Sequence, residues 1–161
     1  MEINNIDIKR LLIIGNSTIH KTKYLLQMLQ NKVEYSIFII TDDIQDPCFQ
    51  LMQKENSNIV ISSDLDILPK IDEIHQKCVV VFDSNIVVPI DYYIRSRSHG
   101  IDIICLAHEY ADLPMMIRRN AFNVLLLEIS ISKDRYFLTD QYPRYAVDLW
   151  VFNNEEHILL C

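Results

Sequence analysis

A run of four apolar residues that ends at a glycine is the feature that most restricts how this chain can fold. The run is Leu11–Ile14, and Gly15 follows it directly. A short polar stretch then leads to Lys21 and Thr22, which begin a segment with apolar residues at helical spacing. We therefore expect a buried strand, a tight turn and a helix in this order.

The spacing of these residues is close to that of a phosphate-binding P-loop, G-x-x-x-x-G-K-[ST]. Gly15, Lys21 and Thr22 occupy three of the four defined positions, and His20 stands in place of the second glycine. In a P-loop we expect Gly15 to form the first turn, Lys21 to reach the β- and γ-phosphates and Thr22 to bind Mg²⁺. The alternative is an ordinary strand-turn-helix, which the side chain of His20 favours.

Short apolar runs alternate with amphipathic segments along the chain. The expected strands are 10–15, 35–41, 58–62, 78–83, 101–107 and 124–129, followed by 135–138, 145–152 and 157–160. The expected helices are 21–31, 46–53, 89–96 and 112–121, and 63–74 is expected to be loop and helix broken at Pro69. This pattern predicts an α/β fold, a mostly parallel sheet with helices on both faces and extra C-terminal strands, as a single domain over 1–161.

Composition narrows the classes of function. The net charge of −7 argues against broad, nonspecific nucleic-acid binding by a free monomer. The four cysteines and five histidines lack zinc-site spacing, so no zinc site is expected. The apolar runs are too short to span a membrane and the N-terminus has no signal-peptide pattern, so we expect an intracellular protein that does not bind membranes.

An aspartate ends the most apolar of the expected strands. This residue is Asp83, and Ser84 follows it. An aspartate at such a place can bind Mg²⁺ beside a P-loop, and the alternative is that it caps a turn. In many P-loop ATPases a second acid follows and polarises the attacking water, whereas a serine hydroxyl is a poor base at neutral pH.

The segment 93–127 contains a further ordered series of residues. Arg97 and His99 precede the strand 101–107, and His108 follows it. Then come the step 110–114 (YADLP), Arg118 and Asn120. Together with the P-loop-like segment and the strand ending at Asp83, this series resembles the genome-packaging ATPases of poxviruses, giant viruses and Polinton/Maverick elements, in the FtsK–HerA superfamily of P-loop NTPases. The resemblance covers residues 10 to 129.

The resemblance implies a site and its ligands. Asp83, His108 and Arg118 would be catalytic, with His108 at the position of the family's sensor glutamine. Arg118 or Arg119 would be an arginine finger that reaches a neighbour's γ-phosphate. The alternative is a cation that offsets the dipole at a helix C-terminus. Gly15, Lys21 and Thr22 would bind ATP, and Thr22 and Asp83 would bind Mg²⁺ if nucleotide binds. Homo-oligomers, capsid or packaging partners and DNA are the implied partners.

Four positions depart from the family's pattern, namely His20, Ser84, Ser98 and His108, and a helical insertion after Glu128 is expected to be missing. The apolar strands are intact while these phosphate-sensing positions have changed. We interpret the chain as a degenerate packaging-ATPase-like protein, a catalytically impaired scaffold or regulatory subunit in the host cytoplasm, nucleus or virion. The alternatives are an active ATP-driven packaging motor, which would be an ATP hydrolase, and a protein-interaction module that binds no nucleotide.

Overall fold

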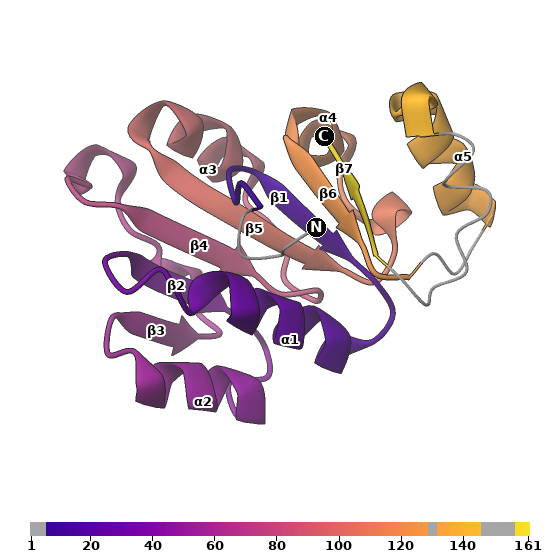
Figure 1. Ribbon diagram of the computed structural model, residues 1–161. Coiled ribbons are helices and arrows are strands. Elements are labelled where there is room, and N and C mark those ends of the chain that lie inside the picture. Colours follow the sequence, from indigo (N-terminus) through magenta and orange to yellow (C-terminus); the bar gives the residue numbers. More distant parts are fainter. Residues whose placement is uncertain (1–5, 129–131, 146–156) are drawn as a thin grey trace.

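The chain forms an α/β structure around one sheet (Figure 1), in a computed structural model that describes residues 6–128, 132–145 and 157–161. Within these residues, seven strands follow the order β3-β2-β4-β5-β1-β6-β7. Every neighbouring pair is parallel except β6 and β7, which are antiparallel. The strands are β1 (Leu11–Ile14), β2 (Ser36–Ile40), β3 (Ile59–Ser62), β4 (Cys78–Phe82), β5 (Ile101–Ala107), β6 (Asn123–Leu126) and β7 (Ile158–Leu160).

Helices cover both faces of this sheet. They are α1 (Thr18–Leu29), α2 (Pro47–Glu55), α3 (Ile90–Arg95), α4 (Met115–Asn120) and α5 (Ser132–Gln141). The helices α1 and α2 lie on one face, and α3 and α4 lie on the other (Figure 1). Short 3-10 helices complete the connections at Leu65–Ile67, Ile71–Glu73, Ser96–His99, Tyr110–Asp112 and Pro143–Tyr145.

The strand β1 shows why its sequence is continuously apolar. Leu11 and Ile13 pack into the core under α1 and α2, while Leu12 and Ile14 pack into the core on the opposite face. All four are buried, and each fully buried side chain of this size contributes about 1.5–3 kcal/mol. Because neither face of the sheet meets solvent here, apolar residues occupy every position instead of alternate ones. The predicted fold class is thereby confirmed.

The sheet brings three strand ends together at one edge. β5 lies between β1 and β4, and all three strands are parallel. Gly15, Asp83 and His108 directly follow β1, β4 and β5, so they leave the sheet on the same side. Open α/β sheets bind ligands outside the carboxyl ends of their strands, which makes this edge the first place to look for a site.

Most expected elements through residue 126 are present. Two corrections concern the start of one helix and the type of helix in another segment. α1 begins at Thr18, three residues before the expected start at Lys21. The segment 63–74 contains two 3-10 helices in place of the expected helix, because Pro69 separates two stretches that are each too short for a stable α-helix.

The C-terminal part differs more from expectation. The predicted strand 135–138 is wrong, because these residues lie within α5. The expected absence of a helical insertion after Glu128 is wrong for the same reason. The predicted strand 145–152 lies outside the described residues except for Tyr145, which belongs to a 3-10 helix. The last predicted strand is confirmed as β7, which runs antiparallel to β6.

Tertiary contacts explain why α5 is a helix despite its β-favouring Tyr-Phe-Leu sequence. The buried carboxylate of Asp134 accepts hydrogen bonds from the backbone N–H groups of Tyr110 (2.7 Å) and Ala111 (2.9 Å). At the other end of α5, the Tyr110 hydroxyl donates to Gln141 Oε1 at 2.6 Å. Burial raises the pKa of Asp134, and the two N–H donors oppose this shift. α5 is therefore attached to the turn that follows β5.

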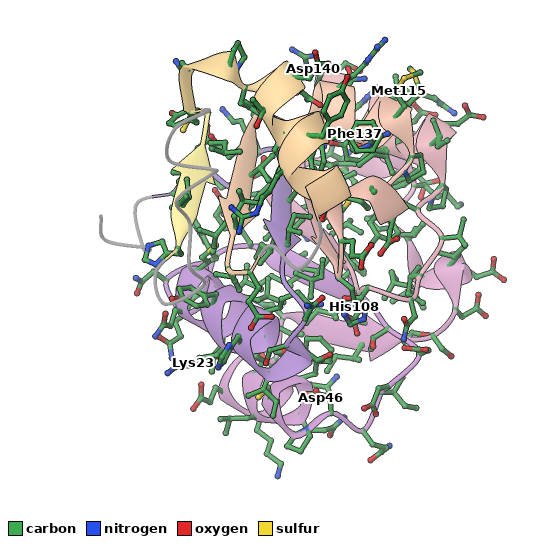
Figure 2. All side chains as sticks on the ribbon, turned by 90° about the vertical axis from the view of Figure 1, so that its right-hand side faces the viewer. Lys23, Asp46, His108, Met115, Phe137 and Asp140 are labelled. Atoms are coloured by element: carbon green, nitrogen blue, oxygen red, sulfur yellow. The ribbon has the colours of Figure 1, made fainter. Side chains whose placement is uncertain are left out.

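We expect Asp134→Ala to lower the free energy of unfolding by about 2 kcal/mol, because one buried and one part-buried N–H group lose a charged acceptor. Asp140→Ala is the matched control, since Asp140 is exposed on the same helix (Figure 2). The control should stay within about 0.5 kcal/mol of the wild type. Urea denaturation measures both variants, and equal effects would contradict the anchoring role of Asp134.

Candidate functional site

The segment between β1 and α1 is shorter than a P-loop. Ser17 caps α1, and its Oγ accepts a hydrogen bond from the His20 backbone N–H at 3.3 Å. In the P-loop pattern the four positions between the two glycines form the loop. Two of these positions, Thr18 and Ile19, are helical here, and so is His20. The loop therefore consists of Gly15, Asn16 and Ser17 alone.

Gly15 is favoured by close packing and not by an unusual turn. Among the described residues, positive φ angles occur at Gly100 and Arg10, and Gly15 is not one of them. A Cβ at Gly15 would lie 3.1 Å from Leu127 Cβ and 3.8 Å from Glu128 Cβ. The missing side chain therefore lets the end of β6 approach the loop closely. The expectation that Gly15 supplies a turn conformation is not needed to explain this residue.

Lys21 is fully buried and points into the strand ends. Its Nζ donates to the carbonyl oxygen of Gly15 at 2.6 Å and more weakly to that of Ala107 at 3.4 Å. The same Nζ lies 3.1 Å from His108 Nδ1, which is also 3.3 Å from the Asn16 carbonyl oxygen. Burial lowers the pKa of Lys21 to about 8, and the negative charges of Asp83 and Glu128 oppose this shift.

The two residues expected to bind Mg²⁺ make hydrogen bonds within the protein. Thr22 is buried, and its Oγ1 donates to the Thr18 carbonyl oxygen at 2.7 Å. Asp83 Oδ2 accepts from Thr41 Oγ1 at 2.8 Å, and Oδ1 accepts from the Ser84 N–H at 2.7 Å. Because the Thr22 hydroxyl is directed back along α1, this arrangement does not offer the Thr–Asp pair that a Mg²⁺ ion would need.

Ser84 also has a distinct environment. Its Oγ is buried and has no hydrogen-bond partner among the described residues. The residue lines a cavity of about 220 Å³ between the ends of β4 and β5, together with Ala107, Asp112 and Pro114. No base is in hydrogen-bonding contact with the Ser84 hydroxyl in the described part of the chain, so this position offers no activated group for attack on a phosphate.

Glu128 is the site residue that sequence reasoning missed. Its Oε2 accepts hydrogen bonds from the N–H groups of Asn16 (3.0 Å) and Ser17 (3.3 Å). Its Oε1 lies 3.4 Å from His20 Nδ1. The available signal was an acid just after an apolar strand, the same pattern that singled out Asp83. A carboxylate of the protein itself therefore binds the first two amides of the loop after Gly15.

The structure brings Gly15, Lys21, Asp83 and His108 to one edge of the sheet, and Figure 2 shows this edge with His108 near its centre. Thr22 lies in α1 with its hydroxyl turned away from the loop. Arg118 belongs to a different cluster, in which its guanidinium carbon lies 5.4 Å from the ring centre of Tyr110 and 4.8 Å from that of Phe137. It packs between α4 and α5, which differs from the exposed position expected of an arginine finger.

The fold is similar to that of solved P-loop NTPase-like structures, among them viral genome-packaging NTPases. The structure of the genome-packaging NTPase B204 from Sulfolobus turreted icosahedral virus 2 in complex with AMP matches with a TM-score of 0.70, 11% identity, 96% of this chain and 93% of that chain. B204, the DNA-packaging ATPase from Sulfolobus turreted icosahedral virus, matches at 0.66, with 13% identity, 95% of this chain and 93% of that one.

EssC from Geobacillus thermodenitrificans (ATPases 2 and 3) matches with a TM-score of 0.57 and 14% identity over 82% of this chain and 34% of that chain. No protein-family model and no curated protein matches the sequence. The resemblance inferred from the motifs is thus confirmed at the level of the fold. In the described part of the chain, no helix combines the length and apolar character needed to cross a membrane.

Lys21 makes stability depend on pH. Its pKa falls from 10.5 to about 8 on folding, so between these values the unfolded chain binds a proton that the folded chain has lost. Stability from this group therefore rises with pH across this window, by up to about 1.4 kcal/mol per pH unit. The unfolding free energy of the wild type relative to Lys21→Met should rise accordingly from pH 8 to 10.5 in urea denaturation. A constant difference would contradict the burial of Lys21.

Arg118 should matter for stability because its guanidinium stacks on two aromatic rings. We expect Arg118→Ala to lower the free energy of unfolding by about 1 kcal/mol. Arg119→Ala removes the same charge from an exposed neighbour and should have little effect. Thermal unfolding compares the two, and an unchanged stability of Arg118→Ala would show that the stacking contributes nothing.

Proposed function

We propose that this chain is a catalytically impaired relative of viral genome-packaging ATPases, acting as a scaffold or regulatory subunit without ATP turnover of its own. The observation that carries the proposal is the arrangement of the loop after β1. Lys21 binds the carbonyl oxygens of Gly15 and Ala107, and Glu128 binds the first loop amides. Both groups that would meet a phosphate are thus occupied by the protein.

Hydrolysis of ATP requires several groups that act together. The attacking water must be oriented, and positive charge must neutralise the terminal phosphate as the bond breaks. Lys21 is held by carbonyl oxygens, Thr22 by its own helix and Arg118 by two aromatic rings. Ser84 stands where a second acid would polarise water. Each replacement or contact removes a separate contribution to catalysis, which supports a loss of turnover.

The fold neighbours support the packaging part of the proposal. They are described as a genome-packaging NTPase and a DNA-packaging ATPase, and some of their structures contain AMP, an ATPγS molecule or AMPPCP. We propose that this chain keeps the scaffold of such proteins and assembles with copies of itself or with capsid or packaging partners, in the infected cell or the virion. DNA is a further candidate partner through that assembly.

An active packaging motor is the second candidate. It is favoured by one observation, that Lys21 and Asp83 lie at the same edge of the sheet and interact electrostatically. In that case the loop would open around ATP, and Lys21, Thr22 and Asp83 would serve in the roles of an intact P-loop.

The test is inorganic phosphate release by the purified chain at saturating ATP–Mg²⁺. We expect the wild type and Lys21→Ala to release phosphate at the same background rate, because Lys21 does not face a phosphate. Release that is fast in the wild type and lost in Lys21→Ala would refute the proposal and favour the motor. Thermal unfolding with ATP adds a second readout, since a ligand at 100 times its Kd stabilises the fold by about 2.7 kcal/mol. No stabilisation by any nucleotide would favour an interaction module.

A further inference from the structure

Glu128 reaches the loop because the sheet places it there. β6 is parallel to β1, with Leu126 opposite Ile14. The ladder continues one step further, since the Leu127 N–H donates to the Ile14 carbonyl oxygen at 2.8 Å. Glu128 is the next residue, and Gly15 has no side chain to keep it away. Backbone pairing therefore places the Glu128 main chain beside the loop, and the side chain can reach or leave the loop amides by rotation about its own bonds.

Two groups of the loop and one of the first turn of α1 converge on this one carboxylate. They are the N–H groups of Asn16 and Ser17 on Oε2 and the imidazole of His20 near Oε1. The Glu128 side chain is only 20% exposed. Backbone N–H groups just before a helix are also groups that bind phosphate oxygens. The carboxylate thus occupies donors that a phosphate group would require.

We infer that Glu128 is an intramolecular competitor that keeps the phosphate loop closed, and that a polyphosphate ligand binds only when this carboxylate leaves the amides of Asn16 and Ser17. The inference rests on the proposed function, since it treats residues 15–22 as a derived phosphate loop. His20, which replaces the family's second glycine, lies beside the second oxygen of the competing carboxylate, with Nδ1 3.4 Å from Oε1. The replacement of the second glycine by His20 and the binding of the loop amides by Glu128 then belong to the same contact, which excludes a phosphate group from the loop.

Charge repulsion strengthens the competition. A phosphate group that approached the loop while Glu128 stayed in place would meet a carboxylate of the same sign at contact distance. The negative charge of Glu128 also favours the protonated form of Lys21, so its departure changes the electrostatic surroundings of that lysine. Removing the charge of Glu128 while keeping its shape should therefore increase affinity for phosphate groups.

The first experiment measures binding of ATP and of inorganic triphosphate by calorimetry, so that nucleotide recognition and recognition of bare phosphates are distinguished. Glu128→Gln and Glu128→Ala should each bind at least one probe about tenfold or more tightly than the wild type, because the competing charge-assisted hydrogen bonds are lost. Glu55→Gln is the matched control, since it removes the same charge from an exposed residue at the end of α2. Its affinity should equal that of the wild type.

The second experiment needs no ligand. Amide hydrogen exchange by NMR should be at least about tenfold faster at Asn16 and Ser17 in Glu128→Ala than in the wild type, while the core strands keep their protection and so report an intact fold. Unchanged exchange at both amides would overturn the inference. Unchanged affinity for both probes, or no binding by any variant, would overturn it as well. The proposed function fails by a different result, Lys21-dependent phosphate release by the wild type.

Discussion

The buried ammonium group of Lys21 determines the arrangement of the whole carboxyl edge of the sheet. A buried cation must be surrounded by acceptors, because an uncompensated charge in the interior costs several kcal/mol. Here the acceptors are carbonyl oxygens at the ends of β1 and β5, with His108 beside them. The lysine thereby ties α1 to two adjacent strands. Any ligand that needed Lys21 would have to replace these contacts with equally good ones.

The other residues of this edge fit the same condition. The negative charges of Asp83 and Glu128 favour the protonated form of Lys21, and each carboxylate accepts hydrogen bonds from the protein. Because α1 begins at Thr18, the loop before it is short. The N–H groups of Asn16 and Ser17 in this loop donate hydrogen bonds to Glu128. Apart from the hydroxyl of Ser84, which has no partner among the described residues, these polar groups satisfy one another without a ligand. An ancestral phosphate site that had lost its ligand would have to reach such a state to stay stable.

The sequence predicted the sheet well because each buried strand has an unbroken apolar run, and the ends of these runs located Asp83 and His108. It failed where structure depends on distant partners. Residues 135–138 include two aromatic residues and have no clear helical periodicity. The contacts of Asp134 and Gln141 with the turn after β5 anchor the helix in the structure. Glu128 carried the same signal as Asp83, an acid after a strand, but its neighbour in space could not be read from spacing. Arg118 was noted as a cation, whereas its contact with the ring of Phe137 depends on how α5 packs against α4.

The sequence by itself determined that this chain forms a parallel α/β sheet with a lysine and an aspartate after two of its strands, because apolar runs and strand ends are local properties. Only the tertiary structure decided what those groups contact. The pairing of β6 with β1 places Glu128 on the loop amides, and the pairing of β5 with β1 places Ala107 and His108 against Lys21. Strand order is set by packing between segments far apart in the chain, and it is this order that decides which groups Lys21 and the loop amides contact.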